Sequence, residues 1–257
     1  MENELRNAFQ SRNPVVGSWV LIGHPMVAEV SASLGFDFVV LDTEHPSYSL
    51  ETLDTMIGGV YAADGETRPL VRVPLDERNR VTRVLNMGAY GIIFPAIETA
   101  EEARTAAAAV RYPPDGDRTI APGRGSQYLN SFESYIKTAN DAIVTIVMVE
   151  TERGLENVEA IAAVEGVDGI LIGHEDLSAS LGIFAEWDSD RLLAAFDRII
   201  AAADAAETAV GRVTPDPDII PDQAEMGYDY LITGVDLWHL TRATERTKEV
   251  FNDVYGR

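Results

Sequence analysis

The feature that most constrains the fold is a regular alternation of short apolar segments with helical segments along the 257 residues. Eight apolar segments of strand length each lead into a segment with helical character. This alternation favours a parallel sheet covered by helices. The strands are expected at residues 15–22, 36–41, 68–74, 91–95, 142–149, 169–173, 208–213 and 230–234.

The number of alternations and the chain length predict a single-domain α/β protein, a (β/α)8 TIM barrel spanning residues 1–257. A doubly wound sheet is the alternative. It is disfavoured because no Gly-x-Gly-x-x-Gly segment and no Walker-type loop follows an expected strand.

Composition excludes several classes of function. The net charge of -22 would repel nucleic acid and anionic membranes, so neither is expected as a partner. No apolar run approaches the roughly 20 residues of a membrane span, and the N-terminus lacks the basic and apolar regions of a signal peptide. The chain has no cysteine, which excludes disulfides and thiolate sites. A cytoplasmic protein is expected.

Lysine is nearly absent, and this bears on carbonyl chemistry. Lys137 lies in a polar stretch and Lys248 on a charged segment near the C-terminus, and these are the only two lysines. Schiff-base enzymes need a lysine in a dry, apolar setting, which neither has. Carbonyl chemistry in this chain is therefore expected to use a metal.

Charged residues follow the expected strands at the points where the strands end. In a barrel these carboxyl ends share one mouth, where the functional site lies. The residues at this level are His24, Asp42-Thr43-Glu44-His45, Arg72, Glu150, His174-Glu175-Asp176 and Asp236.

Glu150 and Asp176 follow neighbouring strands, so their carboxylates are expected to face each other across the mouth. Oxygen ligands of this kind suit Mg²⁺ or Mn²⁺. The alternative is that each acid caps the helix that follows it.

Arg72 lies within an apolar strand and therefore needs a partner. A bound carboxylate or enolate oxygen would serve, and so would a structural ion pair with Asp42 or Glu44. His45 is the candidate base, because imidazole titrates near neutral pH. The alternative for His45 is a surface position at the start of a helix.

At these residues the chain resembles the HpcH/HpaI aldolase family, metal-dependent class II enzymes that cleave or form 2-keto-3-deoxy sugar acids. The resemblance runs through nearly the whole chain. It rests on Gly17-Ser18-Trp19, Asp42-Thr43-Glu44-His45, Val71-Arg72-Val73-Pro74, Arg111-Tyr112-Pro113-Pro114, Glu150-Thr151, Gly166-Val167-Asp168-Gly169, Asp176-Leu177-Ser178 and Gly234-Val235-Asp236.

The resemblance implies that Glu150 and Asp176 hold a divalent metal, Mg²⁺ or Mn²⁺, with Co²⁺ as a further candidate. It also implies that Arg72 stabilises an enolate oxygen and that His45 acts as the base. The predicted substrate-binding residues are Arg72, Gly173, His174 and Asp176.

The chain departs from the family pattern at Asn86, at Met148, at His174-Glu175 and in the loop at 118–124, and the first and third of these lie at the predicted site. Asn86 stands where the family has the aspartate that pairs with the histidine, and it completes the predicted catalytic set with His45 and Arg72. An asparagine can orient an imidazole but cannot stabilise imidazolium with a charge. His174-Glu175 replaces Pro-Ala before Asp176, which adds a histidine and an acid beside the predicted metal.

The predicted function is aldol cleavage and condensation of a 2-keto-4-hydroxy acid, giving pyruvate and an aldehyde. One alternative is a citrate lyase β-like or acyl-CoA lyase, disfavoured because no basic cluster for the phosphates of CoA is evident. Another is a barrel that binds metal and keto acid with little turnover. The expected partners are a small-molecule keto acid and an aldehyde. The family suggests a homo-oligomer, a hexamer or trimer, with the helix at 237–254 exchanged between subunits.

The dispersed acidic residues and the scarcity of lysine predict a halophilic protein, because salt screens the repulsion between surface carboxylates. The melting temperature is expected to rise from low salt to molar salt. Differential scanning calorimetry in KCl measures it, and an unchanged melting temperature would contradict the prediction.

Overall fold

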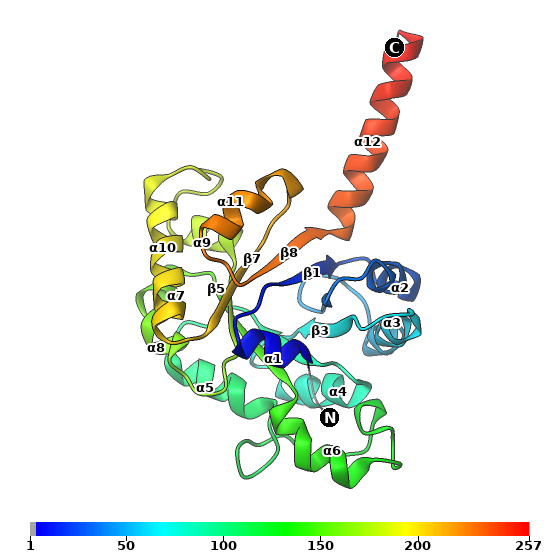
Figure 1. Cartoon of the computed structure of the whole chain (residues 1–257), viewed down its shortest axis with the longest axis vertical. Coiled ribbons are helices and arrows are strands. Elements are labelled where there is room, and N and C mark those ends of the chain that lie inside the picture. The colour runs from blue at the N-terminus through cyan, green and yellow to red at the C-terminus, as the bar shows by residue number, and fades with distance from the viewer. Residues whose placement is uncertain (1–3, 257) are drawn as a thin grey trace.

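The computed structural model describes residues 4–256; Met1 to Asn3 and Arg257, which the predicted domain includes, lie outside it. Eight parallel strands follow one another around a closed barrel, and pairing of β8 with β1 completes it (Figure 1). The predicted (β/α)8 barrel is confirmed. The strands are β1 (Val15–Val20), β2 (Phe38–Asp42), β3 (Arg68–Arg72), β4 (Gly91–Phe94), β5 (Val144–Val149), β6 (Gly169–Ile172), β7 (Ala209–Val213) and β8 (Tyr230–Val235).

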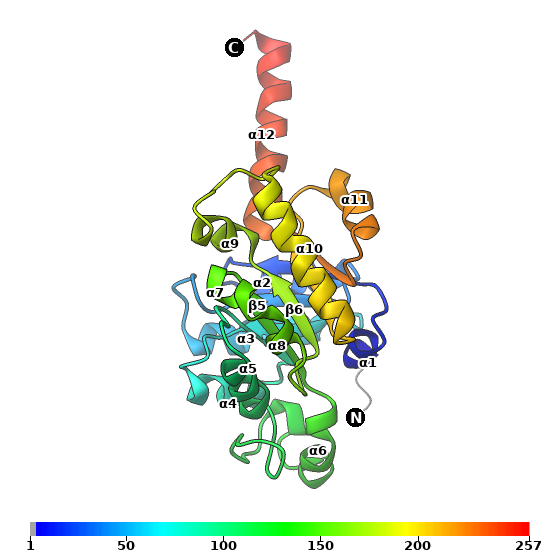
Figure 2. The same ribbon diagram turned by 90° about the vertical axis from the view of Figure 1, so that its left-hand side faces the viewer.

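Helices surround the barrel, except that the last one projects away from it (Figures 1 and 2). No helix within residues 4–256 is long and apolar enough to cross a membrane. The helices are α1 (Glu4–Gln10), α2 (Pro25–Ser33), α3 (Leu50–Ala62), α4 (Arg78–Met87), α5 (Ala100–Ala109), α6 (Phe132–Thr138), α7 (Glu152–Glu156), α8 (Val158–Ala162), α9 (His174–Ser180), α10 (Asp190–Ala205), α11 (Ile220–Glu225) and α12 (Asp236–Tyr255), with short 3₁₀ turns η1 (Arg124–Ser126), η2 (Ala139–Asp141) and η3 (Pro217–Ile219).

One expected helix is interrupted. The pattern at 154–163 predicts a single helix, but the chain turns at Asn157, where φ is -105° and ψ is 7°. The Asn157 side-chain amide donates to the carbonyl oxygens of Glu98 and Arg153, at 2.9 and 3.0 Å. An asparagine that bonds nearby backbone in this way competes with helix continuation.

Two apolar layers form the core. Alternate residues of a strand face opposite sides of the sheet. On β2, Phe38 and Val40 fill the barrel interior, while Val39 and Leu41 pack under the helices. The next residue, Asp42, therefore points inward at the mouth.

The same alternation directs two further charged residues to the mouth. Leu70 lies inside the barrel on β3, so Arg72 two residues later also points inward. Ile146 and Met148 lie inside on β5, which directs Glu150 inward just beyond the strand. Period-two alternation thus brings an arginine and acids from different strands to one opening.

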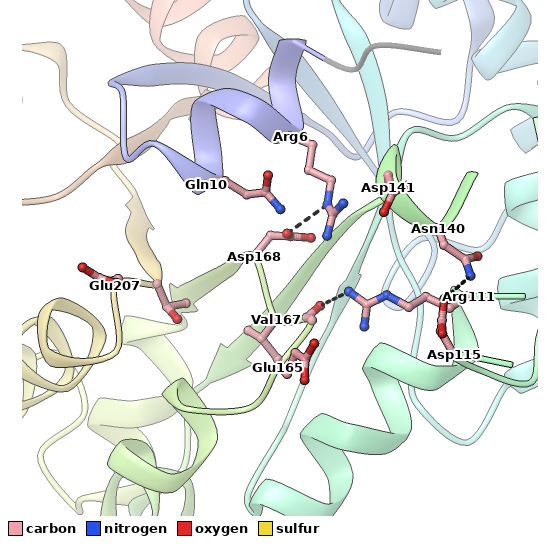
Figure 3. Close-up of a pocket in the computed structure, with 12 residues that line it drawn as sticks. Arg6, Gln10, Arg111, Asp115, Asn140, Asp141, Glu165, Val167, Asp168 and Glu207 are labelled. Atoms are coloured by element: carbon pink, nitrogen blue, oxygen red, sulfur yellow. Dashed lines mark hydrogen bonds and ion pairs between the residues drawn. The ribbon is translucent and has the colours of Figure 1, made fainter. Parts of the chain in front are cut away.

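The opposite end of the barrel is closed by α1. The ring of Phe9 lies 4.9 Å from that of Tyr230 and 6.2 Å from that of Phe38. Arg6 reaches from α1 to Asp168 (Figure 3). Its Nε lies 3.0 Å from Asp168 Oδ1. These contacts fix the floor of the barrel, while function is expected at the other end.

Aspartates before three strands hold the strand starts together. Each accepts the backbone N–H of a residue at the start of the preceding strand and so satisfies that donor. The pairs are Val16 with Asp37 (2.8 Å), Thr145 with Asp168 (2.9 Å) and Val210 with Asp229 (2.9 Å).

Candidate active site

A buried ion pair lies at the centre of the barrel mouth. Asp42 of β2 stands opposite Arg72 of β3 in the strand register. Arg72 Nε donates to Asp42 Oδ1 at 2.9 Å, and Nη2 donates to Oδ2. Asp42 has no solvent exposure and Arg72 is 7% exposed. This bidentate pair sets the plane of the guanidinium.

Two further side chains surround Arg72. Its Nη1 lies 2.8 Å from Glu44 Oε2, and its guanidinium carbon lies 4.9 Å from the centre of the Trp19 ring. The indole N–H of Trp19 donates to Asp42 Oδ2 at 3.4 Å. Burial lowers the pKa of Arg72, but the hydrogen bond and charge of Asp42 and the charge of Glu44 outweigh it, so the pKa is raised. The guanidinium stays charged.

Glu150 is a buried carboxylate with one hydrogen-bonded oxygen and one oxygen that has no partner among the described residues. It is 7% exposed, and its Oε1 accepts the backbone N–H of Ala96 at 2.7 Å. Its Oε2 has no hydrogen-bond partner within residues 4–256. Burial raises the pKa of Glu150 to about 7; the Ala96 bond opposes this rise, and the negative charge of Asp176 adds to it.

The backbone around Glu150 is specialised. A Cβ at Gly173 would lie 2.4 Å from Glu150 Oε2, so only glycine allows this approach. Ala96 has φ of 51°, a left-handed conformation that is uncommon for a residue with a Cβ. Strain of this kind is characteristic of functional sites, and here it aims an N–H group at Glu150.

Glu150 and Asp176 form the candidate metal pair. Asp176, in the first turn of α9, is close enough for its charge to affect Glu150. No group of three or more His, Asp or Glu side chains within the described residues is arranged to hold a metal. Two carboxylates with an unpartnered Oε2 nevertheless fit a hard cation whose remaining positions are filled by water and substrate oxygens.

His45 and Asn86, predicted to act together, have different surroundings within one chain. His45 is exposed, and its side chain has no hydrogen bond or ion pair to residues 4–256. Asn86 Oδ1 instead accepts from Nη2 of Arg118 at 3.0 Å. The predicted pairing of His45 with Asn86 is therefore not made in this chain, and the catalytic roles of both stay predictions.

Arg118 was not singled out from the sequence, yet it is almost fully enclosed. It is 1% exposed, with its guanidinium 4.4 Å from the centre of the Tyr112 ring and Nη2 3.3 Å from the Tyr135 hydroxyl. Its Nε and Nη1 have no partner among the described residues. A buried arginine that lacks a carboxylate is costly, because its desolvation is only partly compensated.

His174 packs against an aromatic ring. Its ring lies 5.7 Å from that of Trp187 in an edge-on arrangement, and it is buried. Burial lowers its pKa to about 3, and the charge of Arg212 contributes. The imidazole is therefore neutral, so its 3.2 Å separation from Glu175 is not an ion pair. Its predicted role in substrate binding stays a prediction.

His24 and Asp236, also at the level of the strand ends, have structural contacts. The two Asp236 carboxylate oxygens accept the backbone N–H groups of Leu21 and Ile22, at 3.0 and 2.8 Å. His24 Nδ1 accepts the N–H of Met26 and caps α2. Both fix the connection from β1 to α2.

A polar cavity of about 660 Å³ lies at the opposite end of the barrel (Figure 3). Its two arginines have structural contacts: Arg6 pairs with Asp168, and Arg111 donates to the Gly166 carbonyl at 3.3 Å. None of the predicted site residues lines it. The mouth is therefore the candidate site.

The chain is similar to known proteins over nearly its whole length. A sequence model of the HpcH/HpaI aldolase/citrate lyase family matches residues 16–243. A hydroxypyruvate/pyruvate aldolase of Paraburkholderia phytofirmans is 34% identical over 248 residues, 95% of each chain. A 5-keto-4-deoxy-D-glucarate aldolase of Escherichia coli is 32% identical over 250 residues, 97% of this chain and 96% of that one. The crystal structure of an HpcH/HpaI aldolase/citrate lyase family protein from Burkholderia cenocepacia has a TM-score of 0.92 and 32% identity, covering 98% of this chain and all of that one.

The raised pKa of Glu150 makes cation binding pH-dependent. In the metal-free protein the ionisation of Glu150 is unfavourable in the folded state. The free energy of unfolding therefore falls as the pH rises from 4.5, the ordinary pKa of a glutamate, through about 7. A cation binds the ionised form, so the increase in melting temperature caused by Mn²⁺ should be small at acid pH and grow as the pH rises through 7. Thermal melting with and without Mn²⁺ measures this increase.

Glu150→Gln should abolish the increase in melting temperature, while Glu152→Gln, at a residue in an exposed ion pair with Arg191, should keep it. Equal shifts at both ends of the pH range would contradict the prediction.

Replacing Asn86 by aspartate should stabilise the protein, because a carboxylate would then face the buried Arg118. A gain of roughly 1–2 kcal/mol in unfolding free energy is expected for this charge-assisted bond. Urea denaturation measures it. Asn79→Asp, an exposed position on the same helix, controls for adding a negative charge to α4. A gain no larger than that of the control would show that Arg118 does not respond to the carboxylate.

Proposed function

The chain belongs to the HpcH/HpaI aldolase/citrate lyase family and is a carbon–carbon lyase, and we propose that it is a class II pyruvate aldolase. The reaction is cleavage or formation of a 2-keto-4-hydroxy acid, such as a 2-keto-3-deoxy sugar acid, with pyruvate and an aldehyde as the other side of the equilibrium. The observation that carries this proposal is that one barrel mouth holds both a charged arginine oriented by Asp42 and the buried carboxylate of Glu150, whose Oε2 has no partner among the described residues.

Glu150 and Asp176 would hold the divalent cation, Mg²⁺ or Mn²⁺, with Co²⁺ as a further candidate. When bound, the cation supplies Lewis-acid polarisation of the keto group. The unpartnered Glu150 Oε2 and the close approach of Gly173 support this assignment. The same surroundings, through backbone N–H groups near Gly173, suit the carboxylate of the keto acid.

Arg72 is suited to stabilising the enolate oxygen. Cleavage breaks the bond between C3 and C4 of the substrate and places negative charge on the C2 oxygen. Asp42 and Trp19 hold the guanidinium before substrate arrives, so little reorganisation is needed when that charge develops. Glu44 forms an ion pair with Nη1 of Arg72 in the free protein, and a substrate oxygen would compete with Glu44 for this donor.

His45 would move the proton. In cleavage it takes the proton of the 4-hydroxyl as the aldehyde forms, and the C3 carbon then accepts a proton to give the methyl group of pyruvate. His45 is exposed beside Glu44, where a substrate entering the mouth can reach it. Within one chain Asn86 Oδ1 is bonded to Arg118, so the predicted part of Asn86 in orienting His45 has no contact to support it among the described residues.

Two alternatives differ from the aldolase in the products they would give: one would give other products, and one would give none. A citrate lyase β-like enzyme would cleave a citryl or acyl-CoA substrate, and a non-catalytic barrel would bind keto acid and cation without turnover. A panel of aldehydes with pyruvate or hydroxypyruvate, analysed by product mass, separates them.

The aldolase should form product with Mn²⁺ or Mg²⁺ and lose activity in EDTA. Arg72→Lys should lower kcat about 100- to 1,000-fold, because lysine cannot keep the bidentate bond that aims the donor. Arg104→Lys, in an exposed ion pair on α5, should leave kcat unchanged. Absence of product across the panel, with cation binding retained, would favour the non-catalytic alternative.

We also propose a homo-oligomer, a hexamer or trimer, in which α12 is exchanged between subunits. Helix α12 projects from the barrel (Figures 1 and 2). Several of its apolar side chains are exposed, including Leu240, Phe251 and Val254, the last of them 72% exposed. An exposed apolar stripe of this kind favours association. Within one chain the helix is attached to the barrel near its start, through Trp238 and the bond from Arg242 to the Pro215 carbonyl.

A complementary groove lies where an eighth outer helix of a barrel would pack. This cavity of about 570 Å³ lies between α2 and α11 beside β1 and β8. Met26, Val30 and Leu34 line it, and all three are exposed. The α12 of a second copy would cover these side chains.

Charged substitutions on either surface should dissociate the assembly. Leu240→Asp on α12 and Val30→Asp in the groove should each reduce the mass measured by light scattering after size-exclusion chromatography. Leu193→Asp, which adds the same charge at an exposed leucine of α10, should not. A monomeric full-length protein would contradict the proposal.

We further propose that the protein works in a salt-rich cytoplasm. Support comes from the net charge of -22 and from the paucity of lysine, with Lys137 and Lys248 the only two. Hydrated surface carboxylates repel one another less when salt screens them. The salt dependence of melting described above tests this directly.

A further inference from the structure

The loop from Thr43 to Ser49 carries Glu44 and His45 over the barrel mouth, and its first half is firmly attached. The Thr43 hydroxyl donates to the Arg72 carbonyl at 2.6 Å, and the Glu44 N–H donates to Asp42 Oδ1 at 2.9 Å. Arg80 Nη1 donates to the Thr43 carbonyl at 3.3 Å. The residues before His45 are thus tied to β3 and to the buried ion pair.

The second half of this loop returns to the same strand through Tyr48. The Tyr48 hydroxyl donates to the backbone carbonyl of Asp42, the last residue of β2. The ring lies against Gly23, where an added Cβ would come within 2.6 Å of Tyr48 Cδ1. Burial raises the pKa of the Tyr48 hydroxyl, and the charge of Asp42 adds to this, so the hydroxyl stays protonated as a donor.

The loop is therefore hydrogen-bonded to the barrel on both sides of His45, through Thr43 and Tyr48, but not through the His45 side chain. Its side chain is exposed and makes no hydrogen bond or ion pair within residues 4–256. The position of its imidazole depends on the backbone of the loop, which Thr43 fixes on one side and Tyr48 on the other.

We propose that Tyr48 is a positioning residue. Its hydroxyl bonds the loop of His45 to the end of β2, and its ring packs against Gly23, where a larger residue would displace it. The inference rests on the proposed aldolase function, because it concerns the proton-moving residue of that reaction. Without this closure the segment 45–49 gains conformational freedom, and His45 spends less time aligned with the substrate hydroxyl.

The test uses full-length protein with Mn²⁺ and compares Tyr48→Phe with Tyr61→Phe. Tyr61 makes the same kind of bond, from its hydroxyl to the Gly88 carbonyl at 2.6 Å, but lies away from the mouth. Tyr48→Phe should lower kcat about 10- to 100-fold with KM for pyruvate nearly unchanged. It should slow exchange of the C3 hydrogens of pyruvate with D₂O by a similar factor. Tyr61→Phe should leave both rates at the wild-type value.

A second measurement follows the loop itself. Amide hydrogen exchange of the peptide spanning 43–49 should be faster in Tyr48→Phe than in the wild type or in Tyr61→Phe. Gly23→Ala, which displaces the ring without removing the hydroxyl, should reproduce both the faster amide exchange and the lower kcat.

Wild-type kcat in Tyr48→Phe would overturn the proposal, and so would unchanged amide exchange of the loop. A fall in kcat equal to that of Tyr61→Phe would also overturn it, because the effect would then be general. If the wild-type protein forms no product with any aldehyde, the proposed function fails. The amide exchange then still decides whether Tyr48 closes the loop.

Discussion

The mouth of this barrel depends on one buried interaction, the bidentate pair between Asp42 and Arg72. Neither charge could remain inside the barrel alone, because removing either partner would leave an uncompensated charge in a low-dielectric interior. The pair also restrains its surroundings. Trp19 packs against the guanidinium and bonds the carboxylate, and the loop of His45 is attached to Asp42 at both the side chain and the backbone.

The second constraint is an excess of negative charge in the mouth. The negative charges of Asp176 and Glu44 outweigh the positive charge of Arg72 at Glu150, and the burial of Glu150 makes its ionisation unfavourable near neutral pH. One Glu150 oxygen accepts the Ala96 N–H, and the other, close to Gly173, has no donor within residues 4–256. A divalent cation would relieve both the repulsion and the missing partner, which is the physical reason to propose one here.

Several surfaces and side chains that the structure describes are left exposed or incompletely paired within a single chain, which supports the proposed homo-oligomer. The apolar side of α12 is exposed, and a groove with matching apolar residues is open beside β1 and β8. Asn86 is bonded to Arg118 and not to His45. Arg118 in turn has no carboxylate partner in the part of the chain that the structure describes, so the asparagine at position 86 leaves a buried charge less compensated than an aspartate would.

The sequence by itself determined the barrel and the inward direction of Asp42, Arg72 and Glu150. These follow from the alternation of strands with helices and from the period-two alternation within each strand, which are local properties that apolar residues make visible. Only the tertiary structure decided what each charged group contacts. Each of these contacts joins residues that are far apart in the sequence: Ala96 and Glu150 are 54 positions apart, Trp19 and Arg72 are 53 apart, and Asn86 and Arg118 are 32 apart. Such contacts depend on barrel closure and on the path of irregular loops, and hydrophobic periodicity carries no information about either.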